Sequence, residues 1–371
     1  MIDPHVPDFT DIVVELIDLP FDTGRKFIKL SYRDERLKDY SLIVVADSLS
    51  QGQPSLFSRL STFIVRYPRY VHAEALRHRV ISRNAASSRA RSVKATIKEV
   101  MENPTIPLFT VNQKGMGGRF SEPERREKQI AAWLRARDRA VASVLELIVG
   151  PEIFDNYGNG FDDASGVAAA WEEILDDYYA NGYDSNGDAR EGYLSTHKQQ
   201  FNRLIENFGP FEEIITASYW DNFLELRDHD LAQPEIRAFA ALVRKALEVS
   251  EARETWIHAP FIPLDEIPEE PTDFDSVRPL LLRSANECAQ VSYNDKSAAT
   301  KTTASATKGE ELFRLKHYSP FEHQAIAEIP FDEEVVSQSA GQDFVRDEDQ
   351  LVSNLDWSWV QLRSILAGVT K

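Results

Sequence analysis

The separation of strand-like and helix-like patterns along the chain is the feature that most constrains its fold. Short β-branched runs bounded by Asp, Gly or Pro are typical of strands, and they occupy residues 13–17, 27–30, 42–45 and 61–65. Further along, apolar residues recur at helical spacing, with charges opposite, in residues 122–148 and 233–250. The sequence therefore predicts an α+β fold with a mixed or antiparallel sheet and long flanking helices.

Shorter patterns predict the connecting elements. Residues 47–52 indicate a turn, and a helix is expected to begin at Pro68 and to run into the segment around Arg77. A further helix is predicted at 166–180. The residues of 294–309 are mostly Thr, Ala, Ser and Lys, which predicts a flexible loop.

The segment from Trp220 to Arg227 has helical apolar spacing. This spacing predicts a helix in which Phe223 and Leu226 belong to the core. Arg227 lies five residues after Asn222, roughly 140° round a helix, so the two side chains need not face one ligand.

The composition is that of an ordinary soluble globular protein, with 42% hydrophobic and 27% charged residues. The net charge of −18 should repel nucleic acid polymers and anionic membranes. The sequence has no run of about 18 uncharged apolar residues, and its start lacks the pattern of a signal peptide. With Cys288 as its one cysteine, the chain is expected to be cytoplasmic.

One basic segment stands out in this acidic chain. Residues 77–94 contain no acidic side chain and six basic ones, namely Arg77, Arg79, Arg83, Arg89, Arg91 and Lys94. Guanidinium groups bind phosphate and stack on flat rings, while the interleaved Ser and Asn side chains can donate to phosphate or base atoms. No Glu at i,i+4 spacing neutralises these cations. A site for an anion and a planar ligand is therefore favoured over a solvated basic helix face.

Other motifs give weaker signals. Residues 184–188 resemble the start of a calcium loop, but Ala189 and Ser195 stand where the loop requires Gly and Glu. His317 and His323 are six residues apart, which does not match a zinc spacing, so we expect no metal. For His323, a functional role and a purely structural one are about equally supported. Cys288 is interpreted as a buried structural cysteine.

Four segments together resemble the flavin-dependent thymidylate synthases. The family signature Arg-His-Arg-x-x-Ser-x-Asn-Glu-x-Ser-x-Arg-Tyr is similar to residues 77–90. Residues 222–233 resemble its Asn-Phe-Leu-x-Leu-Arg…Ala-Gln stretch, residues 289–293 its Ala-Arg-Val-Ser-Tyr, and residues 317–323 its His-x-Ser-Pro-Phe-Glu-His. The last two motifs usually precede the signature and here follow it. The chain therefore resembles a circularly permuted variant, similar to members encoded by bacteriophages.

The resemblance implies FAD-dependent methylation of dUMP to dTMP. Methylenetetrahydrofolate would donate the carbon and NADPH the electrons, in a homo-oligomer that is a tetramer in the family. The implied fold is that of the thymidylate-synthase-complementing proteins, in one domain. Its core would span 60–253 and 280–325, with an N-terminal β extension at 1–50, an insertion at 154–200 and a C-terminal extension at 330–371.

The resemblance also implies roles for individual residues. FAD would be contacted by Arg77, His78, Arg79, Asn84, Asn222, Ser292 and His323. The nucleotide dUMP would be bound by Glu74, Ser87, Arg89, Arg203 and Arg227. Arg227 would stabilise negative charge on the uracil ring, and Arg227 and His323 are the predicted catalytic residues.

Departures from the family pattern leave alternatives open. Ala85 and Ala90 replace the Glu and Tyr of the signature, and Thr216 and Ser218 replace an Asn and an Arg. Glu74 stands where the family has Gln. One alternative is flavin-dependent hydroxymethylation, or a related C5 modification, of a pyrimidine nucleotide. Another is a non-catalytic nucleotide-binding protein on the same scaffold.

Overall fold

The structure is a computed structural model. It describes residues 6–19, 24–51, 59–85, 87–88, 91–114, 117–157, 164–291, 305–327, 355 and 358–369. The predictions for Arg89 and Ser292, and most of those for 294–309 and 330–371, lie outside these residues.

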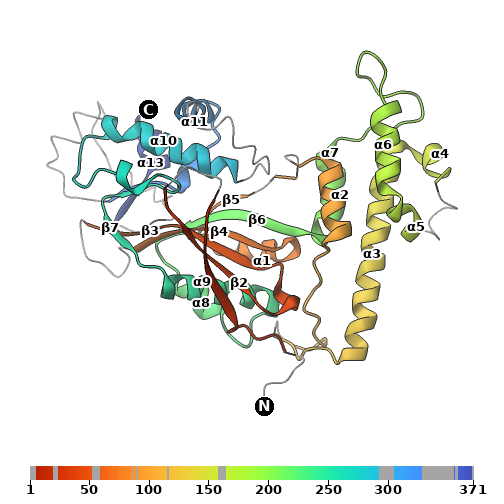
Figure 1. Cartoon of the computed structure of the whole chain (residues 1–371), viewed down its shortest axis with the longest axis horizontal. Helices are drawn as coiled ribbons and strands as arrows, with labels where there is room; N and C mark the ends of the chain where they lie inside the picture. Colours follow the sequence, from red (N-terminus) through yellow and green to blue (C-terminus); the bar gives the residue numbers. More distant parts are fainter. Residues whose placement is uncertain are drawn as a thin grey trace.

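A seven-stranded mixed sheet lies at the centre of the molecule (Figure 1). Six strands follow the order β1-β2-β3-β4-β6-β5 with antiparallel neighbours, whereas β7 pairs parallel with β3. The strands are β1 (Ile12–Ile17), β2 (Phe27–Tyr32), β3 (Ser41–Ser50), β4 (Arg59–Pro68), β5 (Ser82–Ala85), β6 (Pro210–Ala217) and β7 (Arg253–Thr255). This architecture confirms the predicted α+β class.

The four strands predicted near the N-terminus all form, and each extends beyond its β-branched run. The predicted turn at 47–52 is wrong for its first four residues, because β3 continues to Ser50 and pairs there with both β4 and β7. Strands β1 to β3, which the resemblance treats as an extension, are thus continuous with the central sheet.

Helices α8 (Asp221–Arg227) and α9 (Pro234–Val249) cover one face of this sheet (Figure 1). The prediction for Phe223 is confirmed, since its side chain is fully buried. The prediction for Leu226 is wrong, because that side chain is 54% exposed and Leu224 is buried instead. Phe223, Leu224 and Arg227 define the inward arc of α8, which turns Leu226 towards solvent.

A smaller three-stranded sheet and several helices pack beside the central sheet. Ile64 and Ile214 of the central sheet share a core cluster with Cys288 near the end of α10. The elements of this part are β8 (Ile257–His258), η5 (Leu264–Glu266), α10 (Phe274–Gln290), α11 (Ser305–Arg314), η7 (Ser319–Glu322), β9 (Ala325–Ala327), β10 (Trp359–Gln361) and α13 (Leu362–Val369). Helix α11 begins inside the loop predicted at 294–309, so residues 305–309 are helical instead.

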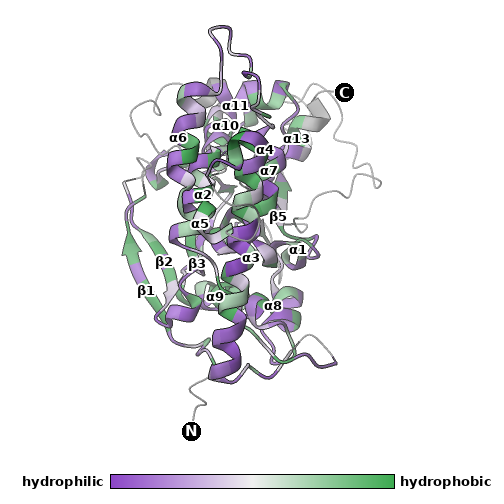
Figure 2. Ribbon diagram, turned by 90° about the vertical axis from the view of Figure 1, so that its right-hand side faces the viewer, coloured by the Kyte–Doolittle hydropathy of each residue, from purple (hydrophilic) through white to green (hydrophobic). Residues whose placement is uncertain are grey.

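A helical arm extends from the other end of the sheet (Figure 1) and has its own apolar core. It consists of α2 (Val93–Glu102), α3 (Pro123–Val149), α4 (Pro151–Phe154), α5 (Ala164–Ala169), α6 (Trp171–Asn181) and α7 (Lys198–Ile205). The two long helices predicted from periodicity, α3 and α9, are confirmed. The helix predicted at 166–180 is two helices that meet at Ala170. Figure 2 shows that the end of α3 nearest the N-terminus is mostly hydrophilic.

The chain between the sheet and the basic segment is helical for a shorter distance than predicted. After Pro68 it forms η2 (Arg69–Val71) and α1 (His72–Ala75), then turns, and residues 82–85 form the edge strand β5. Short 3-10 turns also occur at η1 (Glu35–Leu37) and η4 (Glu206–Phe208). Residues 77–85 of the basic segment therefore form a turn followed by a strand at one edge of the central sheet, whereas Lys94 lies in α2.

Candidate functional site

Strand β5 anchors the basic segment against β6. Ser82, Arg83 and Asn84 lie opposite Thr216, Ile215 and Ile214 in an antiparallel register. The Arg83 guanidinium pairs with Glu213, whose side chain is fully buried, and it also donates to the carbonyl oxygen of Ala75 at 3.0 Å. These contacts of Arg83 fix α1 and β5 against the sheet, so we interpret Arg83 as a structural residue rather than a ligand-binding one.

The signature segment meets α8 through Arg227. Its Nε donates to Nε2 of His78 at 2.8 Å, and its Nη1 forms an ion pair with Glu74. Burial, with the neighbouring Arg227 guanidinium, lowers the pKa of His78 to about 4. Since an arginine only donates, His78 accepts at Nε2 and carries its proton on Nδ1. Arg227 is 8% exposed, so it is a nearly buried cation held by two oriented partners.

The 317–323 motif and Cys288, the residue just before the 289–293 motif, reach the same edge of the sheet. The Asn84 amide donates to the carbonyl oxygen of Cys288 at 2.9 Å, and its Oδ1 accepts from the hydroxyl of Ser319 at 3.2 Å. Below them, Nδ1 of His323 lies 2.8 Å from Oγ1 of Thr216. His323 is fully buried, and burial lowers its pKa to about 3. Segments more than two hundred residues apart in the sequence thus meet around β5.

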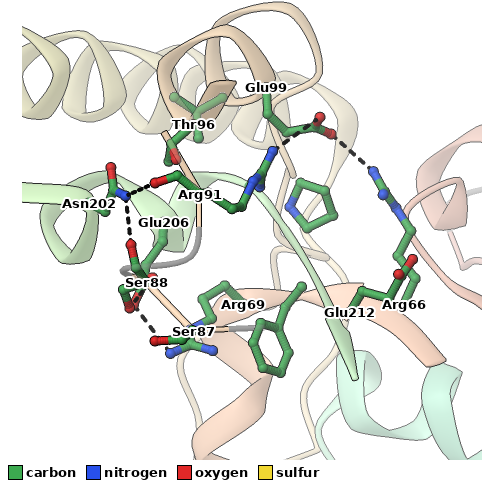
Figure 3. Close-up of a pocket in the computed structure, with 14 residues that line it drawn as sticks. Arg66, Arg69, Ser87, Ser88, Arg91, Thr96, Glu99, Asn202, Glu206 and Glu212 are labelled. Carbon is green, nitrogen blue, oxygen red and sulfur yellow. Dashed lines mark hydrogen bonds and ion pairs between the residues drawn. The ribbon is translucent and has the colours of Figure 1, made fainter. Parts of the chain in front are cut away.

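A small cavity lies between β4, β6, α2 and α7, at the end of β6 that begins with Pro210 (Figure 3). It has a volume of about 90 Å³, and the side chains around it include Arg66, Arg69, Arg91, Ser87 and Ser88. Carboxylates hold the guanidinium groups in place. Glu99 lies 3.0 Å from Arg66 and 3.8 Å from Arg91, and Glu206 lies 3.2 Å from Arg69.

Two buried polar atoms of the cavity lining have no protein partner in the described part of the chain, namely Nε of Arg91 and Oδ1 of Asn202. Asn202 donates from its amide nitrogen to the carbonyl oxygen of Ser88 at 2.7 Å, which orders the end of the basic segment. Arg69 stacks over the ring of Phe211 at 4.2 Å. Three guanidinium groups and the Ser87 hydroxyl offer donors for a phosphate-sized anion. The carboxylates of Glu99, Glu206 and Glu212 line the same cavity and offset the arginine charge, and Glu206 also accepts from the Ser88 hydroxyl.

The predicted site residues fall into three groups. In the first group, Glu74 and His78 both contact Arg227. Ser87, which lines the cavity, stands apart from the three groups. Asn84 and His323 lie at the motif junction. The side chains of Arg77, Arg79, Arg203 and Asn222 are exposed, and none of these four lines the cavity. Arg203 in particular points to solvent from α7, so its predicted phosphate contact has no support in this geometry.

Sequence reasoning did not identify Arg66 and Arg69. They flank Tyr67 and Pro68 at the end of β4, three residues apart, and only the pairing of β4 with β6 brings them to Ser87. It also missed the buried polar residues Thr62 and His258, which contact each other at 2.7 Å. An arginine pair at a strand end was a usable signal, whereas buried Thr and His residues give none.

The residues implied to hold FAD fit such a group in part. Arg77 and Arg79 flank the buried His78 and are exposed, which suits two guanidinium groups for a diphosphate. Nε2 of His323 is buried without a partner among the described residues, as expected of an atom that meets a ligand. The Asn84 amide is already bonded to Cys288 and Ser319, so it is the least suited of the set.

Within the described residues, no group of three or more His, Cys, Asp or Glu side chains could hold a metal ion. In the same part of the chain, no helix is both long enough and apolar enough to cross a membrane.

Comparison with known proteins gives a distant structural resemblance. No family model and no curated protein sequence matches the chain. The solved structures it resembles include the UMP/dUMP methylase PolB from Streptomyces cacaoi bound with 5-Br UMP, at 15% identity and a TM-score of 0.35, covering 56% of this chain and 88% of that one. The same enzyme bound with 5-Br dUMP matches at 16% identity and a TM-score of 0.32, covering 64% and 90%. At these TM-scores the likeness carries no functional argument, which rests on the residues instead.

Proposed function

We propose that this protein methylates C5 of a pyrimidine nucleotide, with dUMP as substrate and dTMP as product. FAD would be the redox cofactor, methylenetetrahydrofolate the carbon donor and NADPH the reductant. One observation carries the proposal: three of the segments that resemble one family's motifs, in permuted order, contact the signature segment or its partner strand β6, and Cys288 beside the fourth motif does so too. Sequence resemblance by chance would not predict that convergence.

The cavity beside Ser87 is proposed to bind the nucleotide phosphate. Arg66, Arg69 and Arg91 supply guanidinium donors there and Ser87 a hydroxyl group, while Glu99, Glu206 and Glu212 carry compensating negative charge. The glutamates that pair with these arginines restrain the guanidinium groups before a ligand arrives, which reduces the entropy lost on binding.

Arg227 is proposed to act on the uracil ring. His78 and Glu74 occupy its Nε and Nη1, and within the described chain its Nη2 makes no hydrogen bond. That N–H group can stabilise negative charge that develops on the base when C5 becomes nucleophilic. A neutral His78 orients the guanidinium without adding a second positive charge.

The chemistry cannot use the thiolate of this chain's cysteine. Cys288 is fully buried and burial raises the pKa of its thiol well above the usual range, so it stays protonated. Bound FAD would instead supply the hydride, with Arg77 and Arg79 proposed to hold its diphosphate. The protein's own contribution is then to position the nucleotide and to stabilise charge.

Spectroscopy and product analysis test this proposal directly. The purified full chain should show flavin absorbance, and incubation with dUMP, methylenetetrahydrofolate and NADPH should yield dTMP. Parallel reactions with UMP test the choice of sugar. A product heavier by a hydroxymethyl group would instead support the hydroxymethylation alternative, which Ala85 motivates at the position of the signature Glu. A protein that binds neither flavin nor dUMP would refute the proposal.

A further inference from the structure

A chain of buried polar side chains crosses the central sheet behind the candidate site. The hydroxyl of Ser48 lies 2.8 Å from Nδ1 of His258, and Nε2 of His258 lies 2.7 Å from Oγ1 of Thr62. Oγ1 of Thr62 lies 2.7 Å from Oγ1 of Thr216, which in turn lies 2.8 Å from Nδ1 of His323. Ser48 is 6% exposed and the other four residues are fully buried.

Each hydrogen bond in this series needs one donated proton, and each side chain has only one proton to donate. A threonine hydroxyl has a single proton to donate, and a neutral imidazole carries one N–H. Burial lowers the pKa of both His258 and His323 to about 3, so both rings are neutral at pH 7. The three links from His258 to His323 are therefore all made only when their hydrogens point in the same direction.

Two arrangements satisfy all three links. In one, His258 donates from Nε2, each threonine donates onward, and His323 accepts at Nδ1 and keeps its proton on Nε2. In the other, His323 donates from Nδ1, each threonine donates back, and His258 accepts at Nε2 and keeps its proton on Nδ1. Any other arrangement leaves a buried hydroxyl proton unpaired or breaks the link between Thr62 and Thr216, which is unfavourable. The two histidines must therefore carry the same tautomer.

We propose that Thr62 and Thr216 couple the tautomers of His258 and His323, so that His258 is a positioning residue for the free ring nitrogen of His323. That nitrogen, Nε2, is buried and has no partner among the described residues. The coupling decides whether Nε2 donates to or accepts from a hydrogen-bonding atom of the heterocycle bound at the site. The role in turnover rests on the proposed function, whereas the coupling itself does not.

Imidazole ¹⁵N NMR of the labelled full-length protein tests the coupling without any substrate. Long-range proton–nitrogen spectra distinguish the two neutral tautomers, and His258→Gln and His323→Gln assign the signals. In the unmodified protein we expect the two rings to show the same tautomer, in about tenfold or greater excess. Opposite tautomers in the unmodified protein would overturn the proposal with no variant needed.

Two variants then probe the coupling at a distance. If both rings carry the proton on Nδ1, Thr62→Val should change the tautomer of His323, although Thr62 does not contact that ring. The reason is that the Thr216 hydroxyl loses its acceptor and donates to Nδ1 of His323 instead. If both rings carry the proton on Nε2, Thr216→Val should change the tautomer of His258, because the Thr62 hydroxyl then loses its acceptor and donates to Nε2 of His258. Thr62→Ser and Thr216→Ser keep the hydroxyl and should change neither ring. Thr105→Val removes a buried hydroxyl that is not part of this hydrogen-bonded series, and it serves as the matched control.

A remote ring that keeps its tautomer in the appropriate valine variant would refute the coupling. If a valine variant does not fold, Thr→Ala at the same position removes the same hydroxyl with less bulk. If the rings carry their protons on Nδ1, Thr62→Val, which changes the tautomer of His323, should lose about tenfold in kcat with an unchanged KM for dUMP. If they carry them on Nε2, Thr62→Val leaves the tautomer of His323 as it is and should keep its kcat. The opposite result in either case would overturn the role in turnover. Coupled tautomers without dTMP formation would instead refute only the proposed function.

Discussion

At the scale of single residues, the role of each buried arginine depends on its burial and on the groups it contacts. Arg227 is nearly buried and is restrained by one neutral ring and one carboxylate, so its position is set before substrate binds. Arg83, in β5, is also an arginine, but its partner Glu213 is fully buried, so the role of Arg83 is structural. Two arginines of related segments thus have different functions because their burial and partners differ.

Replacing Arg227 should reduce catalysis much more than binding. For Arg227→Ala we expect a loss in kcat of about a hundredfold or more, typical of removing a charge-stabilising donor. Arg227→Lys retains the charge but cannot bond to both His78 and Glu74, so it should recover only part of the activity. Steady-state kinetics with dUMP measures both variants. Equal activity of Arg227→Ala and the unmodified protein would support the non-catalytic alternative.

Arg69 should determine how tightly the nucleotide phosphate is held. A hydrogen bond to a charged group contributes about 1.5–3 kcal/mol, so Arg69→Gln should weaken dUMP binding by roughly ten- to a hundredfold. Calorimetry with dUMP measures the loss, and deoxyuridine, which has no phosphate, should bind both forms equally. Arg135→Gln, at an exposed position of α3, is the control. Comparable losses for dUMP and deoxyuridine would exclude the cavity as the phosphate site.

At the scale of elements, short segments depend on tertiary contacts more than long ones. Helices α3 and α9 follow from apolar periodicity, which sequence shows directly. Strand β5 has four residues and a basic, polar sequence, so nothing local predicts it. It forms because β6 offers an open edge and because Arg83 reaches Glu213 across it. The placement of β5 therefore depends on its pairing with β6 and on one buried ion pair.

Removing that pair should destabilise the protein more than it changes the chemistry of the site. Breaking a buried ion pair by removing one charge costs about 3–5 kcal/mol, and we expect a loss of that size for Glu213→Gln. Chemical denaturation monitored by fluorescence measures it. Glu225→Gln makes the same change at an exposed position of α8 and should cost much less. Equal stabilities of the two variants would show that β5 is held by other contacts.

The end of α3 gives a prediction about backbone geometry. Gly150 has a φ of 84°, and a Cβ there would lie 2.1 Å from the carbonyl oxygen of Gly192. Gly150→Ala should therefore cost at least about 1–3 kcal/mol and loosen the helical arm. Gly187 has a similar φ of 85°, but no atom lies within 4 Å of a Cβ placed there. Gly187→Ala therefore introduces the backbone strain without a steric clash, and it should cost less stability. Hydrogen exchange of α3 reports the effect, and equal exchange in the two variants would contradict it.

At the scale of the whole molecule, stability should depend on pH through buried histidines. Burial lowers the pKa of His72, His258 and His323 to about 3 and that of His78 to about 4. Below about pH 6.5 the unfolded chain binds protons at these rings and the folded chain does not, so stability falls as pH decreases towards 4. Burial raises the pKa of Asp39 to about 6 and also raises the pKa of Glu213, Glu235 and Glu322, and these four carboxyl groups act in the opposite direction at lower pH. The histidine contribution is therefore read from the difference between the protein and its histidine variants.

Urea denaturation between pH 7 and pH 4 measures this dependence. Each such histidine contributes a slope of up to about 1.4 kcal/mol per pH unit in that window. The slope should be smaller in His258→Gln, which removes one of the four groups. Equal slopes for His258→Gln and the unmodified protein would show that the His258 ring is not held neutral in the folded state.

The sequence by itself determined the class of fold and the long helices, and it singled out the basic segment as a candidate site. Periodicity and local charge are properties of neighbouring residues, so they can be recognised without coordinates. Only the tertiary structure decided which distant groups complete that site. Arg66 and Arg69, the link between Arg227 and His78, and the buried chain from Ser48 to His323 all arise from strand pairing and helix packing. Contacts of that kind depend on the register of β4, β6 and β5, which no local pattern encodes.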